Sequence, residues 1–429
     1  MKSSKFNFIV ENDNENIIYN FLTTSFIVLD RRNFDLYQKG QYECVEQNEV
    51  LIKAGILVED GLDEEKYYRQ IISDAQNKQK ELFDEITIFT TTACNARCYY
   101  CYEHNLTPIS LDRQMMDAVI KFITNNYDGN KVTLRWFGGE PLVNVNVIDI
   151  ICDELQKKSI EFTSKMITNG FLFDDATIQR AKTNWKLEAL QITLDGLYED
   201  YDKIKNYKGD IKNSFAKVID NVQKLIVQKI LVSIRINYDV DDTSCAKKLI
   251  DFLSTHFEDK KYLSVSCAAV REAGKPSLAS FNSSNSPQLE LLQYLYEHGF
   301  VKNIANILPR PKVFPCEANV PRRYFIYPNG NIYKCQHTIS DDFFDPVGNI
   351  LAEKFNNEIL EQWSKVEIPE KCGCCRIFPI CQGGCRSLRK QNLVPDSECN
   401  KYKNSFDGLL KLYYKFYKEE KNNGSTKNG

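Results

Sequence analysis

Between Asp84 and Glu272, short apolar runs alternate with longer amphipathic segments. The apolar runs have the length of strands, and they predict six of them: Ile86–Thr91, Val132–Phe137, Phe162–Ile167, Leu187–Leu194, Leu231–Tyr238 and Leu263–Ala269. The segments between them carry apolar residues at helical spacing, for example Leu111–Asn126, Val145–Lys158, Ser214–Gln228 and Ala246–Phe257. This alternation predicts right-handed βαβ crossovers and a parallel sheet, with too few units for a closed eight-stranded barrel.

The regions on either side have different patterns. Residues 1–83 predict a small α+β module with strands at Phe6–Val10, Ile17–Tyr19, Ser25–Asp30 and Ile56–Val58 and helices at Asn33–Lys39, Glu46–Ala54 and Glu64–Leu82. Such a module either covers the edge of the barrel or offers an exposed strand edge to a peptide. Within the barrel region, 84–310, we expect a loop at Ala273–Pro287 and a helix at Leu289–Leu308. A cysteine-rich region, 311–405, and a C-terminal helix and tail, 406–429, complete the chain.

Composition narrows the setting in which the protein works. The 429 residues are 43% hydrophobic and 26% charged with a net charge of −3, which suits two or three globular domains. Because the charges are mixed along the chain, we expect neither nucleic acid nor a membrane as a partner. The first residues lack the apolar segment of a secretory signal, so we expect a cytoplasmic protein. In that compartment, 15 cysteines indicate metal ligation rather than disulfides.

Three of these cysteines follow the first predicted barrel strand in the stretch TTACNARCYYCYE. Cys94, Cys98 and Cys101 form a C-x-x-x-C-x-x-C array, which a loop can wrap around a metal cluster. A cubane cluster has four irons, so three cysteines leave one iron open to a small molecule. The alternative is a zinc site, which is usually built from four ligands in C-x-x-C pairs.

This array, with the aromatic Tyr100 before its last cysteine, resembles the radical S-adenosylmethionine (SAM) superfamily. The resemblance implies an open (β/α)6 barrel and a [4Fe–4S] cluster whose open iron chelates SAM. It also implies reductive cleavage of SAM to a 5′-deoxyadenosyl radical. Active sites of such barrels lie at the carboxyl ends of the strands, and the cysteine loop follows the carboxyl end of the first predicted strand.

The ends of the other predicted strands carry further candidate SAM-binding residues. Gly138-Gly139-Glu140 follows the second strand, and its glycines allow the backbone to come close to a ligand. The resemblance implies that this motif binds the methionyl amine of SAM. An ordinary turn is the alternative. By the same resemblance, positions near the SAM ribose and the substrate are assigned to Thr168, Asn169 and Asp195.

The fifth strand carries Arg235, which suits the carboxylate of SAM or, alternatively, a structural ion pair inside the barrel. The chain also departs from the family after Asp195. Relatives commonly have a His-Asp pair and then an Arg, where this chain has Tyr201-Asp202 and then Lys205. This departure puts the role of that loop in doubt.

The C-terminal cysteines resemble the seven-cysteine SPASM domain of radical SAM maturases. The first two cysteines flank a hairpin signal at Pro328-Asn329-Gly330, and the region has more cysteines than one metal site needs. Zinc ribbons are the alternative. The resemblance implies two auxiliary [4Fe–4S] clusters, an inner one on Cys316, Cys335 and Cys385 and an outer one on Cys372, Cys375, Cys381 and Cys399. We expect no ligand role for Cys374, Cys44, Cys152 or Cys245, whereas Cys267 is a candidate fourth ligand of the inner cluster.

SPASM enzymes mostly modify peptides, so the resemblance implies a maturase that forms a thioether or carbon–carbon crosslink in a ribosomally made precursor peptide. Its partners would be that peptide, bound through a leader by residues 1–83, and an electron donor of the flavodoxin or ferredoxin type. One alternative is an anaerobic sulfatase maturase, which forms formylglycine. Those enzymes have an Asp after the cysteine that corresponds to Cys335, where this chain has Gln336-His337. A non-catalytic Fe–S scaffold is the alternative from another class.

Overall fold

The computed structural model describes residues 1–11, 15–79, 85–103, 106–209, 211–270, 286–339, 344–364, 368–390, 402 and 405–425. The predicted loop at Ala273–Pro287 therefore lies almost entirely outside the described residues, as does Cys399. None of the described helices is long and apolar enough to cross a membrane.

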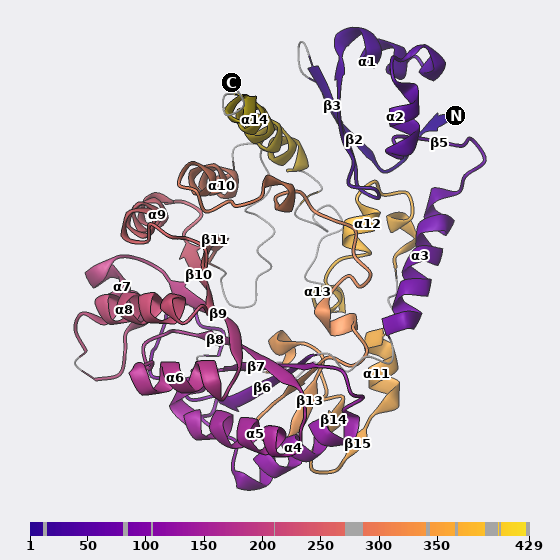
Figure 1. Ribbon diagram of the computed structural model, residues 1–429. Helices are drawn as coiled ribbons and strands as arrows, with labels where there is room; N and C mark the ends of the chain where they lie inside the picture. Colours follow the sequence, from indigo (N-terminus) through magenta and orange to yellow (C-terminus); the bar gives the residue numbers. More distant parts are fainter. Residues whose placement is uncertain are drawn as a thin grey trace.

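A curved parallel sheet lies inside a row of helices, in the lower left part of Figure 1. Six neighbouring strands follow one another in chain order and correspond to the six predicted ones: β6 (Glu85–Thr91), β7 (Val132–Gly138), β8 (Phe162–Thr168), β9 (Leu187–Leu194), β10 (Leu231–Tyr238) and β11 (Leu263–Ala269). Every pairing among them is parallel. The predicted partial (β/α)6 barrel is thus confirmed.

Helices cover the outer face of this sheet, as Figure 1 shows. They are α4 (Arg113–Asn126), α5 (Val145–Lys157), α6 (Asp175–Thr183), α7 (Tyr198–Lys205), α8 (Ser214–Val227), α9 (Ser244–His256) and α10 (Pro287–Glu297). Helix α4 begins where Asp112 accepts a hydrogen bond from the backbone N–H of Met115, which satisfies a donor left free at a helix start. Its apolar stripe packs with alternate sheet residues such as Trp136, which is completely buried.

The sheet extends beyond the barrel in a way that the sequence did not predict. Strands β12 (Tyr324–Ile326) and β13 (Asn331–Tyr333) form the expected hairpin, closed at Gly330 with a φ of 85°. Strand β12 pairs in parallel with β6, and β14 (Gly348–Asn349) and β15 (Lys354–Phe355) continue the sheet to ten strands. The cysteine-rich region is therefore joined to the barrel through backbone hydrogen bonds.

The described part of the cysteine-rich region also contains short helices: α11 (Asn357–Ser364), α12 (Phe378–Cys381) and α13 (Arg386–Lys390). The helix predicted over Leu289–Leu308 is shorter than expected. It ends at Glu297 because Gly299 adopts a left-handed conformation, with a φ of 73°, and a 3-10 turn follows at Ile304–Asn306.

The N-terminal module is the predicted α+β unit. Its described elements are β1 (Lys2–Ser3), β2 (Asn7–Val10), β3 (Glu15–Asn20), β4 (Phe26–Asp30), α1 (Arg31–Gln38), α2 (Asn48–Lys53), β5 (Leu57–Val58) and α3 (Glu64–Gln79). The antiparallel sheet β2-β3-β4 packs against the C-terminal helix α14 (Phe406–Ser425), and the Phe21 and Phe406 rings lie 4.6 Å apart. Tyr68 of α3 donates a hydrogen bond of 2.7 Å to the carbonyl of Pro379, which ties the module to the cysteine-rich region.

Candidate active site at the mouth of the barrel

The cysteine loop continues directly from β6 and lies at the carboxyl end of the parallel sheet. The side chains of Cys94, Cys98 and Cys101 are all partly buried. Burial raises the pKa of the Cys94 thiol to about 12, and the nearby Glu140, Cys98 and Cys101 add to the shift. The three thiols are thus neighbours in a poorly hydrated loop, where thiolates need a cationic centre to be stable.

The glycine pair after β7 allows the backbone of the cysteine loop to lie against that strand. A Cβ on Gly138 would lie 2.1 Å from the carbonyl oxygen of Thr91, and one on Gly139 would lie 2.6 Å from the carbonyl oxygen of Ala93. The N–H groups of Gly139 and Glu140 donate to these same two carbonyls, each at 3.0 Å. The group that comes close to the two glycines is therefore the backbone of the cysteine loop.

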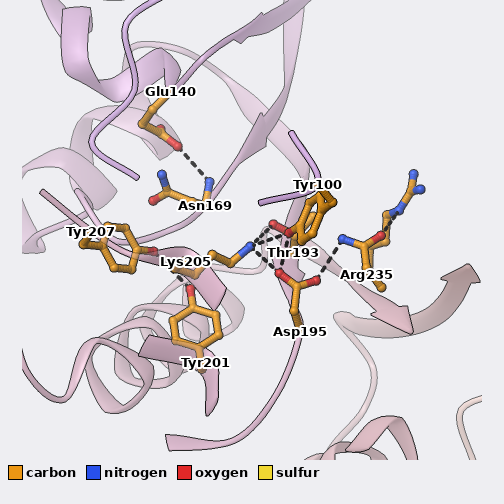
Figure 2. Close-up of polar contacts among 10 residues, drawn as sticks. Tyr100, Glu140, Asn169, Thr193, Asp195, Tyr201, Lys205, Tyr207 and Arg235 are labelled. Carbon is orange, nitrogen blue, oxygen red and sulfur yellow. Dashed lines mark hydrogen bonds and ion pairs between the residues drawn. The ribbon is translucent and has the colours of Figure 1, made fainter. Parts of the chain in front are cut away.

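Glu140 connects the glycine motif to the end of the third barrel strand. Its side chain is completely buried and accepts hydrogen bonds from the N–H of Leu142 at 3.1 Å, the hydroxyl of Thr168 at 2.8 Å and the N–H of Asn169 at 2.8 Å. Figure 2 shows the contact with Asn169. Asn169 in turn donates to the Asn95 side chain at 2.7 Å, so the two motifs predicted from sequence meet at the cysteine loop.

A buried ion pair lies on the other side of the loop (Figure 2). Lys205 Nζ is 2.7 Å from Asp195 Oδ2, and the two side chains are 1% and 2% exposed. Burial alone would lower the pKa of Lys205, but the Asp195 carboxylate raises it above its usual range, which keeps the ammonium group charged. The Tyr100 hydroxyl donates to Asp195 Oδ2 at 2.5 Å and accepts from Lys205 at 3.2 Å.

The network continues to the fifth barrel strand. Asn237 donates to Asp195 Oδ1 at 2.8 Å, and Arg235 Nε donates to Asn237 Oδ1 at 3.0 Å. Arg235 and Asn237 share a face of β10 because successive strand residues alternate between faces. Beside this network a cavity of about 370 Å³ opens, and Tyr99, Tyr100, Asp195 and Asn237 are among its lining residues. This volume is within the range of small-molecule sites.

The structure also brings together part of the C-terminal cysteine set. Burial raises the pKa of the Cys335 thiol to about 12, and the Cys316 and Cys385 thiols add to the shift, so both lie within electrostatic range of Cys335. These three thiols are the ones assigned above to the inner cluster. Cys372, Cys375 and Cys381 pack in a hydrophobic core separate from that of the barrel, together with Phe378 and Ile380.

Three further observations concern ligands and residues that sequence reasoning missed. Cys267 lies on the face of β11 that carries Leu263 and Val265 and packs on the barrel core. In the part of the chain that the structure describes, no three side chains of His, Cys, Asp or Glu are arranged to hold a single metal ion. The ligand roles of the cysteines therefore stay predictions. Lys205 was not among the predicted site residues, because the sequence marked it only as part of the departure from the family pattern after Asp195.

The donor set and the fold together define a class of protein. Partly buried thiols at the carboxyl edge of a partial barrel, beside a polar cavity, suit an Fe–S cluster and a small polar cofactor. Residues 88–239 match the model of the Radical SAM superfamily. They form a radical SAM domain, of a superfamily that binds SAM and a [4Fe–4S] cluster.

Individual relatives share most of the chain. The cysteine-type anaerobic sulfatase-maturating enzyme of Clostridium perfringens (strain 13 / Type A) is 25% identical over 359 residues, which are 74% of this chain and 92% of that protein. The structure of native anSMEcpe with bound AdoMet has a TM-score of 0.56 at 17% identity, over 79% of this chain and 99% of that one. The structure of Streptococcus suis SuiB bound to S-adenosylmethionine has a TM-score of 0.56 at 16% identity, over 93% and 100%. These similarities confirm the fold.

Proposed function

We propose that this protein is a radical SAM maturase that installs a thioether or carbon–carbon crosslink in a ribosomally made precursor peptide. The observation that supports this choice is the extent of the structural likeness. The alignment with SuiB leaves 7% of this chain uncovered, about 30 of 429 residues, so it includes most of the N-terminal module of 83 residues. Another SuiB structure holds a precursor peptide, SuiA. The alignment with native anSMEcpe leaves 21% of the chain uncovered.

In this proposal the residues at the barrel mouth have separate tasks. Cys94, Cys98 and Cys101 hold the [4Fe–4S] cluster, and their partial burial protects it from water. When bound, the cluster and SAM supply a 5′-deoxyadenosyl radical that removes a hydrogen atom from a carbon of the peptide. The cavity beside Tyr100 and Asn237 receives SAM, and Glu140 fixes the loop that surrounds it.

The cysteine-rich region has a supporting task in the proposal. Cys316, Cys335 and Cys385 hold an inner auxiliary cluster, and Cys372, Cys375, Cys381 and Cys399 hold an outer one. The grouping of the first three thiols supports this assignment. Burial of Cys372 and Cys381, which are 9% and 8% exposed, suits the outer site. An electron donor of the flavodoxin or ferredoxin type reduces the enzyme in the cytosol.

A sulfatase maturase is the second candidate, because curated relatives of that activity align over most of the chain. Against it, Gln336-His337 follows Cys335 where the sulfatase maturases have an Asp. His337 is exposed and its ring lies 5.2 Å from that of Tyr102, directly beside the cysteine loop. The position directly after the cysteine, which carries an acid in those enzymes, carries the Gln336 amide here, and the His337 imidazole follows it.

One experiment separates the two candidates. Anaerobically reconstituted and reduced protein is incubated with SAM and, in parallel, with short peptides encoded beside its gene and with a sulfatase-derived peptide that contains the target cysteine. Mass spectrometry then reads the products. The proposal expects loss of two hydrogen atoms and a new crosslink in an encoded neighbour peptide. Formylglycine in the sulfatase peptide, with no change in any neighbour peptide, would overturn it.

A further inference from the structure

The segment from Lys205 to Lys208 runs along the cysteine loop and is hydrogen-bonded to it at two points. The N–H of Arg97 donates to the carbonyl of Lys205, and the N–H of Lys208 donates to the carbonyl of Asn95, each at 2.8 Å. Both bonds engage the residues between the first two cysteines of the array. The departure from the family pattern after Asp195 is therefore in direct contact with the loop.

This segment is itself firmly held. Asn206 adopts a left-handed conformation with a φ of 44°, which ends α7 and turns the chain towards the loop. The Tyr207 hydroxyl lies 3.0 Å from that of Tyr201, and its ring is 4.5 Å from the ring of Phe171. Figure 2 shows Tyr201 below the Lys205 side chain and Tyr207 to the left of it. The segment is a packed element, so it can fix the position of whatever it contacts.

The side chain of Lys205 reaches the loop at a third point. Its ammonium group has three hydrogens and three acceptors: Asp195 at 2.7 Å, Thr193 Oγ1 at 2.7 Å and the Tyr100 hydroxyl at 3.2 Å. The ammonium is thus fully used inside the protein, and at 1% exposure it is not free to bind the carboxylate of a ligand. Tyr100 lies between Cys98 and Cys101, whereas the backbone bonds engage residues before Cys98.

We propose that Lys205 is a positioning residue, whose carbonyl and ammonium group hold the cysteine loop on both sides of Cys98 and so fix Tyr100 against bound SAM. The inference rests on the proposed role of the loop as the SAM site. It assigns Lys205 no contact with SAM; its effect is exerted through Tyr100. A buried ion pair that only stabilises the fold is the competing explanation.

The test compares Lys205→Met, Tyr100→Phe and their combination in anaerobically reconstituted protein at equal iron content. Two quantities are measured: the Kd for SAM by equilibrium dialysis, and hydrogen exchange of peptides that cover residues 94–103. Each single variant should raise the Kd about tenfold, the loss expected for one hydrogen bond to a charged group, and the combination should raise it no further. Exchange in the loop should be clearly faster in Lys205→Met.

Lys224→Met is the matched control, because Lys224 also pairs with carboxylates, those of Asp175 and Asp220, but is 41% exposed on α8. It should leave both measurements unchanged. If Lys205→Met does not fold, the double variant Asp195→Asn/Lys205→Met replaces it, because removing both charges leaves no unpaired buried charge. Wild-type loop exchange and wild-type Kd in the folded variant would overturn the proposal. If the wild-type protein binds no SAM, the proposed function fails, and loop exchange alone decides whether Lys205 holds the loop.

Discussion

Replacing Gly138 by alanine should destabilise the protein strongly and displace the cysteine loop. Gly138 has a φ of 119°, which side chains rarely adopt, and its Cβ would lie 2.1 Å from the carbonyl oxygen of Thr91. That oxygen belongs to the backbone at the start of the loop, so no flexible side chain can move aside. The strands β6 and β7 must separate by more than 1 Å before the contact becomes an ordinary one, roughly 3.4 Å or more.

The magnitude follows from two contributions. The unfavourable φ costs about 1–2 kcal/mol for a residue with a Cβ. Separation of the strands also breaks the hydrogen bonds that Gly139 and Glu140 donate to the loop, each costing about 1–2 kcal/mol at a buried site. We therefore expect the free energy of unfolding to fall by about 3–6 kcal/mol.

Gly129→Ala is the matched control, because Gly129 also has a positive φ, 89°, but a Cβ added there would have no atom within 4 Å. It should cost only the conformational part, about 1–2 kcal/mol. Urea unfolding followed by circular dichroism measures both variants, and iron analysis after reconstitution reports on the loop. Gly138→Ala should also bind less iron. Equal destabilisation by the two variants, with full iron in both, would refute the reasoning.

Three further predictions concern the clusters and the buried carboxylate. Alanine at any one of the three loop cysteines should abolish SAM cleavage without unfolding the protein; native-rate formation of 5′-deoxyadenosine by such a variant would show that the loop is not the reactive site. The reconstituted chain should contain about twelve irons, four for each of three clusters, and Cys374→Ala should not change this number; about four irons would remove the auxiliary clusters. Glu140→Gln should lower the free energy of unfolding by about 1–3 kcal/mol, because an amide N–H₂ in place of either carboxylate oxygen faces a backbone N–H, that of Leu142 or that of Asn169, and an unchanged urea midpoint would count against this role.

The barrel could be predicted because local pattern and tertiary structure agree there. The predicted strand Leu231–Tyr238 matches β10 residue for residue, since buried apolar residues alternate there with less buried ones at the period of a strand. Helix bounds were less certain where a single glycine decides them. Gly299 ends α10 earlier than the apolar pattern of Leu289–Leu308 indicated.

Long-range partners could not be predicted in the same way. Strand β12 pairs with β6 across more than 230 residues, and nothing in the local pattern of Tyr324–Ile326 specifies that edge. Lys205 was likewise missed because a lysine in a charged helix is usually solvated. Its role depends on Asp195 and Tyr100, which the fold alone brings to it. The cysteine positions, by contrast, were evident from their spacing.

The central claim is that the loop of Cys94, Cys98 and Cys101 performs radical SAM chemistry. The most direct test incubates anaerobically reconstituted, dithionite-reduced protein with SAM and measures 5′-deoxyadenosine by liquid chromatography and mass spectrometry. The wild-type protein should form 5′-deoxyadenosine even without a peptide, and Cys98→Ala should form none. Failure of fully iron-loaded, reduced wild-type protein to form any 5′-deoxyadenosine would contradict the claim.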